Sequence, residues 1–339
     1  MTSHVNSPKT QAARKLPTLD TANLPPLPKV SLKRRVRAAA LQVYARLRPH
    51  APEQALVLSA EPRGGSTWVG ELLESEGKVA TVWEPLHIRR VPVARQAGFT
   101  WRQFIPADAD WPEARELMAR ILSGQVVNDW TSSGSSLGDH LRAERLLVKF
   151  CRANACLPWL ARQFDFERKP LFFLRHPFAI AASQAEMANF PFGQVVETIT
   201  ECPFAEARQE HVPFLQSLET VEERAVASWC LSNTATLNDP DAEKLWVTMC
   251  YENLILSPEQ ELERLYSTWG QPVPDRVLSQ VRRPSRMTQD NALQASPEAQ
   301  VRKWRDSFSD AQIARMQAVL DHFNIRIYGS DPMPALSHA

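Results

Sequence analysis

The sequence predicts an α/β fold with a buried, mostly parallel sheet, because short apolar runs alternate with helical patterns from residue 55 onward. The chain has 339 residues, 44% of them hydrophobic, which suffices for one large domain or two smaller ones with a sizeable core. Its 39 Lys and Arg nearly balance 38 Asp and Glu. This balance excludes collagen-like, wholly disordered and strongly polyanion-binding chains.

Five apolar runs predict strands and six periodic segments predict helices. The predicted strands are residues 55–59, 79–82, 146–149, 171–174 and 245–249. The predicted helices are residues 67–75, 158–164, 177–188, 221–236, 258–269 and 310–323. We expect irregular segments at 99–110 and 189–213, and a Ser/Gly loop from residue 129. Long loops of this kind are candidates for an acceptor-binding lid.

Charge marks a boundary near the N-terminus. Residues 1–52 contain ten Lys or Arg and the single acid Asp20, so they carry +9, and the remaining 287 residues carry −8 of the overall +1. We expect residues 1–50 to form a flexible basic arm with one amphipathic helix, residues 51–330 to form the α/β domain, and residues 331–339 to form a tail.

The helix of this arm is predicted to begin after Ser31 and to stop before Pro49. Its apolar positions recur at helical spacing: Leu32, Val36, Ala40, Val43 and Leu47. We expect this stripe to pack on the domain. The alternative is a surface helix, residues 29–48, that makes weak contact with an anionic lipid surface or an acidic partner.

Features of secretion, membrane insertion and disulfide frames are missing from the sequence as given. It has no run of about 18 apolar residues, and the first ten residues do not resemble a secretory signal. The five cysteines are an odd number and form no C-x-x-C pair. This pattern indicates a reducing compartment, and we expect a cytoplasmic protein without a structural zinc.

The first candidate anion site follows the first strand, in the run Pro-Arg-Gly-Gly-Ser-Thr-Trp at residues 62–68. Gly64 and Gly65 permit a tight turn whose amides point inward, and the helix that follows adds free N–H groups at its start. This run is not a Walker A motif, because Arg63 precedes the glycines and no Lys follows them. The alternative interpretation is an ordinary strand–turn–helix corner.

The second candidate anion site follows the fourth strand. Arg175 comes at the end of that strand, Pro177 opens the next helix, and Ser183 lies about two turns into it. An Arg at the carboxyl end of a strand and a helical Ser can together bind one phosphate by charge-assisted hydrogen bonds. The alternative is an Arg paired with a surface carboxylate.

Together these motifs resemble those of the sulfotransferases that use 3′-phosphoadenosine 5′-phosphosulfate (PAPS). Among these enzymes the motifs are most similar to those of the carbohydrate-type members, and the resemblance implies a bacterial member of the family. The resemblance extends over about residues 55–328. It includes Tyr-Glu-Asn-Leu at 251–254, where the family usually has Asp in place of Asn253, and Trp-Arg-Asp-Ser-Phe-Ser at 304–309. It implies a three-layer, P-loop-like α/β domain whose central parallel sheet is flanked by helices.

The resemblance also implies roles for individual residues. Arg63 replaces the Lys that contacts the transferring sulfuryl region in cytosolic members. The residues implied to bind PAPS are Arg63, Gly64, Gly65, Ser66, Thr67, Trp68, Arg175, Ser183, Tyr251 and Arg302. Of these, Trp68 and Tyr251 are implied to lie at the adenine, and Arg175 and Ser183 at the 3′-phosphate. For Arg302 the spacing differs from the family's pattern, so a solvated helix start is an equal alternative.

Two residues are candidates for the base that takes the acceptor proton. The segment Trp-Glu-Pro-Leu-His at 83–87 is similar to a segment of carbohydrate sulfotransferases. Glu84 is our first choice and His87 our second, and we expect burial beside Trp83 to raise the Glu84 pKa. The alternative for both is a structural turn, in which Glu84 caps a neighbouring helix and His87 is a partly buried histidine with its hydrogen bonds satisfied.

Lys149 ends the third strand and resembles a Lys of the cytosolic members. We expect it to neutralise charge on the sulfuryl oxygens or on the departing phosphate. Where those members have a catalytic His, this chain has Cys151, which we interpret as a small buried residue.

The sequence therefore predicts a PAPS-dependent sulfotransferase that modifies a hydroxyl of a carbohydrate or another alcohol by in-line displacement. We expect no metal and no nucleic-acid partner. One alternative is an ATP-dependent P-loop phosphotransferase, which requires the missing Walker Lys. The other is a catalytically inactive module that binds adenosine 3′,5′-bisphosphate (PAP).

Overall fold

The computed structural model describes residues 27, 29–185, 199, 203–283 and 296–335. Five parallel strands form one sheet in the order β2-β3-β1-β4-β5. They are β1 (Leu56–Ala60), β2 (Val79–Trp83), β3 (Arg145–Phe150), β4 (Leu171–Leu174) and β5 (Val247–Cys250). The predicted fold class, a central parallel sheet between helices, is confirmed.

Four of the five strands begin and end within one residue of the predicted bounds. β5 begins two residues later than predicted, because Leu245 ends a short helix and Trp246 is a buried connection. The six predicted helices correspond to α2 (Ser66–Glu74), α6 (Leu157–Gln163), α7 (Pro177–Ala185), α10 (Val221–Leu237), α13 (Pro258–Thr268) and α16 (Asp310–His322).

Further helices, which the sequence patterns above did not predict, complete the described part of the chain. The α-helices are α3 (Pro92–Gln96), α4 (Pro112–Leu122), α5 (Leu137–Arg142), α9 (Val212–Ser217), α11 (Ala242–Leu245), α12 (Tyr251–Leu256), α14 (Asp275–Val281) and α15 (Pro297–Arg302). The 3-10 turns are Pro52–Gln54, Asn154–Cys156, Ala205–His211 and Lys303–Ser307.

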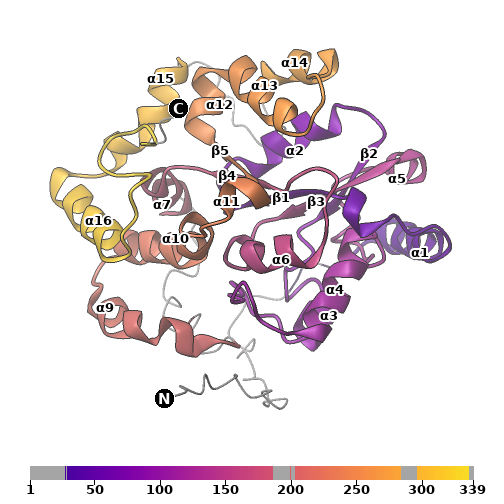
Figure 1. Cartoon of the computed structure of the whole chain (residues 1–339), viewed down its shortest axis with the longest axis horizontal. Coiled ribbons are helices and arrows are strands. Elements are labelled where there is room, and N and C mark those ends of the chain that lie inside the picture. Colours follow the sequence, from indigo (N-terminus) through magenta and orange to yellow (C-terminus); the bar gives the residue numbers. More distant parts are fainter. Residues whose placement is uncertain (1–26, 28, 186–198, 200–202, 284–295, 336–339) are drawn as a thin grey trace, which may run out of the picture.

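Helices cover both faces of the sheet and make three layers (Figure 1). Side chains alternate along β1, so that Leu56 and Leu58 pack with α2, α13 and α14 on one face. Val57 points to the other face and packs with α3, α4 and α6. On that same face Phe172 of β4 joins the cluster formed by α7, α10 and α16.

The register places the ends of the three central strands together. Ser59 of β1 lies beside Phe150 of β3, and Ala60 of β1 lies beside Phe173 of β4. The loops that follow β1, β3 and β4 therefore leave the sheet at the same edge, where ligands bind in open parallel sheets.

The N-terminal helix, α1 (Leu32–Leu47), forms, but its orientation differs from our expectation. The predicted stripe does not pack on the domain, because Leu32, Val36, Val43 and Leu47 are all exposed. The opposite side of α1 is buried instead, at Ala38 and Leu41. Ser31 occupies the N-cap position in an extended conformation, but its side chain makes no capping hydrogen bond.

The predicted loops are only partly within the described residues. Residues 99–110 are irregular, as expected. Within 189–213 only residues 199 and 203–213 are described, and there a 3-10 turn leads into α9. Cys202 also lies outside them, and the other four cysteines are buried and free. Among the described residues, no helix is both long and apolar enough to cross a bilayer.

Candidate active site

The loop after β1 has a backbone that requires glycine at two positions. Gly65 has φ +90°, and a Cβ there would lie 2.8 Å from Cδ2 of Tyr251. A Cβ on Gly64 would lie 2.9 Å from the carbonyl oxygen of Glu61, to which the Gly64 amide donates a hydrogen bond at 2.9 Å. The turn leads directly into α2 at Ser66. The first amides of α2 thus lack intrahelical acceptors and can bind an anion.

The two predicted anion motifs meet in the structure. Arg63 Nε donates a hydrogen bond to Ser183 Oγ at 3.0 Å, and an Nη of Arg175 donates to the Arg63 carbonyl oxygen at 2.9 Å. Neither guanidinium forms an ion pair with a carboxylate of the described residues. Arg175 Nε is buried and has no hydrogen-bond partner in that part of the chain. Two adjacent cations without a carboxylate partner favour binding of an anionic ligand.

Aromatic rings border this pair of arginines. The Arg175 guanidinium lies 4.4 Å from the ring centroid of Tyr251, and Trp68 meets the same ring edge-on at 6.0 Å. The Tyr251 hydroxyl accepts a hydrogen bond from Gln300 at 2.6 Å, a contact that the sequence did not predict. Arg302 ends α15 with an exposed side chain, and no contact among the described residues joins it to the other predicted site residues.

A buried ion pair lies on the other side of α2. Lys149, at the end of β3, is 2% exposed and stacks on the Trp83 ring with Nζ 3.5 Å from its centroid. Its Nζ lies 3.8 Å from Oε1 of Glu84 and 3.4 Å from Oγ1 of Thr67. Glu84 has φ +40°, and its amide donates to the Lys149 carbonyl oxygen at 2.9 Å. Lys149 thus connects Glu84 to the start of α2, which follows the loop after β1.

Our expectation that burial raises the Glu84 pKa is wrong. Burial does favour the neutral carboxyl, but the positive charges of Arg152 and Lys149 outweigh it and hold the Glu84 pKa below its usual value. An Nη of Arg152 donates to Oε2 of Glu84 at 3.0 Å. Arg152 is not among the predicted site residues, although it is a basic residue three positions after Lys149, at the carboxyl end of a strand.

His87 lies between two tryptophans. Its ring is 4.8 Å from Trp101 and 5.1 Å from Trp130, both edge-on. Burial and the charge of Arg152 lower the His87 pKa to about 4, so the imidazole is neutral at pH 7. Its buried Nδ1 has no hydrogen-bond partner among the described residues. These aromatics come from the predicted loops 99–110 and 129–138, beside the end of β2.

Cys151 is 4% exposed, with its Sγ 3.5 Å from Oγ of Ser66. Burial and the nearby negative charge of Glu84 raise the Cys151 pKa to about 11. A thiol of this kind stays protonated at pH 7 and is a poor nucleophile. The interpretation of Cys151 as a small buried residue is confirmed.

The residue after Tyr251 fixes that tyrosine's helix in place. Glu252 is 1% exposed, and its carboxylate accepts hydrogen bonds from the His176 amide and from the Tyr328 hydroxyl, both at 2.8 Å. Burial raises the Glu252 pKa despite these hydrogen bonds. Because His176 directly follows Arg175, this contact holds the end of β4 against the start of α12, and it therefore positions Arg175 over Tyr251.

The site thus contains two chemically different regions separated by the start of α2. One consists of Arg63, Arg175, Ser183 and the loop amides and is cationic. The other consists of Lys149 and Glu84, an ionised carboxylate beside a buried ammonium.

Comparison with known proteins gives only distant structural similarity. No protein-family profile matches the chain, and no curated protein matches it. Similar solved structures include a sulfotransferase domain of the curacin biosynthetic pathway, with 18% identity over 80% of this chain and 98% of that one and a TM-score of 0.44. A sulfotransferase domain of the Synechococcus PCC 7002 olefin synthase has 18% identity over 80% of this chain and 94% of that one, with a TM-score of 0.43. Mouse sulfotransferase SULT7A1 complexed with PAP has 12% identity over 87% of this chain and 91% of that one, with a TM-score of 0.38.

Proposed function

We propose that this chain is a PAPS-dependent sulfotransferase that transfers a sulfuryl group to a hydroxyl. The observation that supports it most is the meeting of Arg63, Ser183 and Arg175, which gives one cationic site from motifs on two different strands. The order along the chain of the motifs that contain Arg63, Arg175 and Ser183 supports it as well.

The residues fit a donor with phosphate groups at two positions. Arg63 and the first amides of α2 would bind the 5′ side, and Arg175 with Ser183 would bind the 3′-phosphate. Nε of Arg175 has no hydrogen-bond partner among the described residues and would supply a donor for that phosphate. Trp68 and Tyr251 border the same site and would bind adenine by stacking. PAPS would supply the sulfuryl group and a phosphate leaving group.

The chain's own residues would then lower the barrier by position and charge. Lys149 lies beside Thr67 and would offset negative charge as it moves to the leaving phosphate oxygen. The acceptor oxygen bonds to sulfur, the bond between sulfur and that phosphate oxygen breaks, and the hydroxyl proton passes to an Oε of Glu84. Glu84 is held by Lys149 and Arg152, so its carboxylate is ionised and oriented before the acceptor binds.

His87 is the second candidate for the base. Its imidazole is neutral at pH 7, as a proton acceptor must be, and its pKa is lowered, as is that of Glu84, so basicity does not separate the two candidates. The place of His87 between Trp101 and Trp130 favours a role in forming the acceptor side of the site. Carbohydrate, lipid and smaller alcohol acceptors all have the hydroxyl that this chemistry requires.

Sulfuryl transfer can be tested directly. The purified chain is incubated with PAPS and pools of carbohydrate, lipid and small-alcohol acceptors, and products are sought by mass spectrometry as acceptors that have gained one SO3 group. We expect at least one pool to yield a sulfate ester together with PAP, without added metal. Transfer of phosphate from ATP and magnesium, with none from PAPS, would support the phosphotransferase alternative. Binding of PAP without any transfer would support the inactive module.

A further inference from the structure

The outer face of α1 is apolar and exposed. Leu32, Val36, Val43 and Leu47 are 75%, 60%, 59% and 77% exposed. Their spacing of four, seven and four residues places them on one side of the helix, together with the exposed Ala39 and Ala40. This stripe is about 24 Å long, as 16 residues of helix require.

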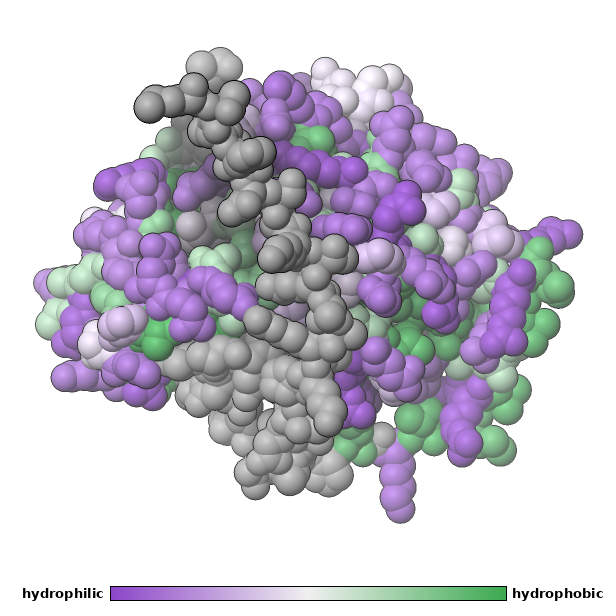
Figure 2. All heavy atoms as spheres, turned by 60° about the horizontal axis from the view of Figure 1, so that its bottom comes forward, coloured by the Kyte–Doolittle hydropathy of each residue, from purple (hydrophilic) through white to green (hydrophobic). Residues whose placement is uncertain are grey.

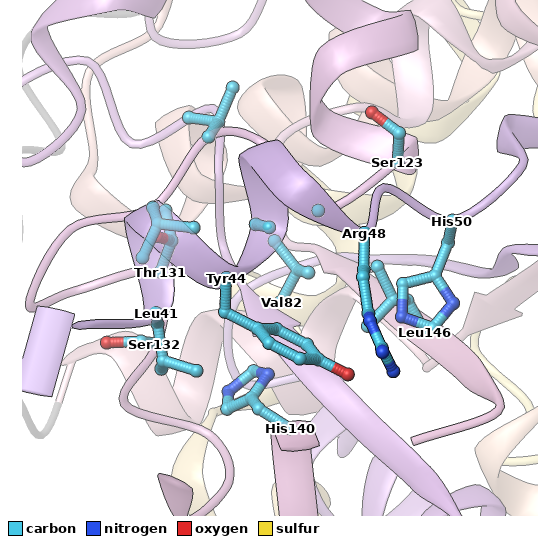
Figure 3. Close-up of a pocket in the computed structure, with 14 residues that line it drawn as sticks. Leu41, Tyr44, Arg48, His50, Val82, Ser123, Thr131, Ser132, His140 and Leu146 are labelled. Carbon is cyan, nitrogen blue, oxygen red and sulfur yellow. The ribbon is translucent and has the colours of Figure 1, made fainter. Parts of the chain in front are cut away.

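The opposite face of α1 packs against the α/β domain. Leu41 and Ala38 are buried there, Tyr44 donates from its hydroxyl to the Leu141 carbonyl at 3.3 Å, and Arg37 donates to the Ser132 carbonyl. Figure 3 shows Leu41 and Tyr44 at a small pocket under α1. None of the residues that line this pocket is a predicted site residue. Turning the stripe inward would break these contacts, so the structure holds it outward.

Exposed large hydrophobic side chains are concentrated at and next to α1. Of the seven large hydrophobic side chains that are exposed in the described residues, four form the stripe, while Leu27 precedes α1 and Leu141 lies on the neighbouring α5. Only Val221 lies elsewhere. In Figure 2 hydrophobic residues (green) lie beside hydrophilic residues (purple) at the right-hand edge of the molecule, where α1 lies. A concentrated apolar patch of this kind marks an interaction surface.

Charge indicates what covers the stripe. Residues 21–52 contain no acid, and residues 29–48 contain seven cations: Lys29, Lys33, Arg34, Arg35, Arg37, Arg46 and Arg48. At about 100° per residue, Lys33 borders the stripe on one side, and Arg35 and Arg46 border it on the other. All three are exposed. The stripe therefore has cations along both edges, and its occupant must be apolar in the middle and anionic on both sides.

We propose that α1 is an interfacial helix that binds the surface of an anionic lipid bilayer. The stripe would lie among the upper acyl chains, while Lys33, Arg35 and Arg46 would reach outward to anionic headgroups. A second copy of the chain fits less well, because a two-fold interface would place the same cationic edges against each other with no acid in residues 21–52 to balance them.

The experiment is co-sedimentation of the full chain with lipid vesicles. One vesicle set is phosphatidylcholine alone, and the other contains phosphatidylglycerol as an anionic component. The test variant carries Leu32→Gln, Val36→Gln, Val43→Gln and Leu47→Gln, because Gln keeps helix propensity high while removing the apolar stripe. Val221→Gln is the control for an exposed apolar residue elsewhere. Circular dichroism and thermal unfolding verify that the variants fold.

We expect the wild-type chain to bind the anionic vesicles, to release with added salt, and to bind phosphatidylcholine weakly. The fourfold variant should bind the anionic vesicles about tenfold more weakly or worse, and Val221→Gln should bind as the wild type does. Equal binding by the fourfold variant would contradict the proposal, because it would assign the attraction to the basic arm alone. A wild-type dimer in sedimentation analysis that the fourfold variant abolishes, without vesicle binding, would also overturn it.

Discussion

Arg63 Nε donates a hydrogen bond to Ser183 Oγ at 3.0 Å, although 120 residues separate them. The contact joins the loop after β1 to the helix after β4, because β1 and β4 are neighbours in the sheet and both run to the same edge. Arg175 closes the arrangement by donating to the Arg63 backbone. A ligand that binds one of these arginines therefore lies within reach of the other.

Replacement of Arg175 tests this arrangement. Arg175→Ala removes a charged hydrogen-bond donor from the proposed 3′-phosphate site, so PAP binding should weaken by about 1.5–3 kcal/mol, while ADP binding should change much less. Arg282→Ala is a suitable control, because Arg282 is also an arginine but pairs with Glu259 on the surface. Titration calorimetry measures the PAP and ADP affinities of both variants. Equal loss of affinity for PAP and ADP would contradict a 3′-phosphate role.

Replacement of Glu84 tests the base. Glu84→Gln keeps the size of the side chain but cannot take a proton, so turnover should fall by more than about a hundredfold while PAP binding persists. His87→Asn is the matched comparison and should lower turnover less. If Glu84→Gln retains wild-type turnover and His87→Asn does not, the base is His87.

Glu84→Gln should also lower stability, because it leaves Lys149 buried without its carboxylate partner. Breaking a buried pair in this way costs about 3–5 kcal/mol. The double variant Glu84→Gln with Lys149→Met removes both charges and should recover part of that loss in urea unfolding, but none of the activity. If the double variant loses as much stability as the sum of the two single changes, or more, Lys149 and Glu84 do not act as a pair.

A glycine comparison tests the proposed anion-binding loop after β1, at residues 62–68. Gly65→Ala and Gly270→Ala both place a Cβ at positive φ, which costs about 1–2 kcal/mol of stability. The Cβ at Gly65 would also meet the Tyr251 ring at 2.8 Å, whereas nothing lies within 4 Å at Gly270. We expect Gly65→Ala alone to weaken PAP binding. Equal PAP affinity in the two variants would argue against a role for the Gly65 turn.

Stability should fall as the pH is lowered from about 6.5 to about 4. Burial lowers the pKa values of His87 and His140 to about 4 and that of His176 to about 3, against 6.5 in the unfolded chain. In this range the unfolded chain binds protons that the folded chain does not, so each histidine lowers the free energy of unfolding by up to about 1.4 kcal/mol per pH unit. Urea unfolding at several pH values measures the slope, and His140→Gln should reduce it. A flat profile would contradict these buried neutral histidines.

The sheet and the two anion motifs were predictable because they depend on local patterns. Apolar runs followed by helix-start signals predicted the bounds of β1 to β4 to within one residue. The edge at which ligands bind a parallel sheet follows from the sheet's topology. Helix α4 was missed, although Pro112 opens it and its buried positions recur at helical spacing.

Other features depend on contacts that sequence patterns do not contain. Periodicity identified the stripe of α1 but not which side of the helix would face the domain, and the contacts of Leu41 and Arg37 decide that. Likewise, the lowered Glu84 pKa depends on Arg152, which reaches it only because β2 and β3 pair in parallel.

The central claim is that Arg63 and Arg175 form one site for a doubly phosphorylated adenosine. The most direct measurement is calorimetric titration of the wild-type chain with PAP and with ADP, with and without magnesium. We predict that PAP binds much more tightly than ADP, with an affinity that does not depend on magnesium. ADP binding that equals or exceeds PAP binding, or that requires magnesium, would contradict it.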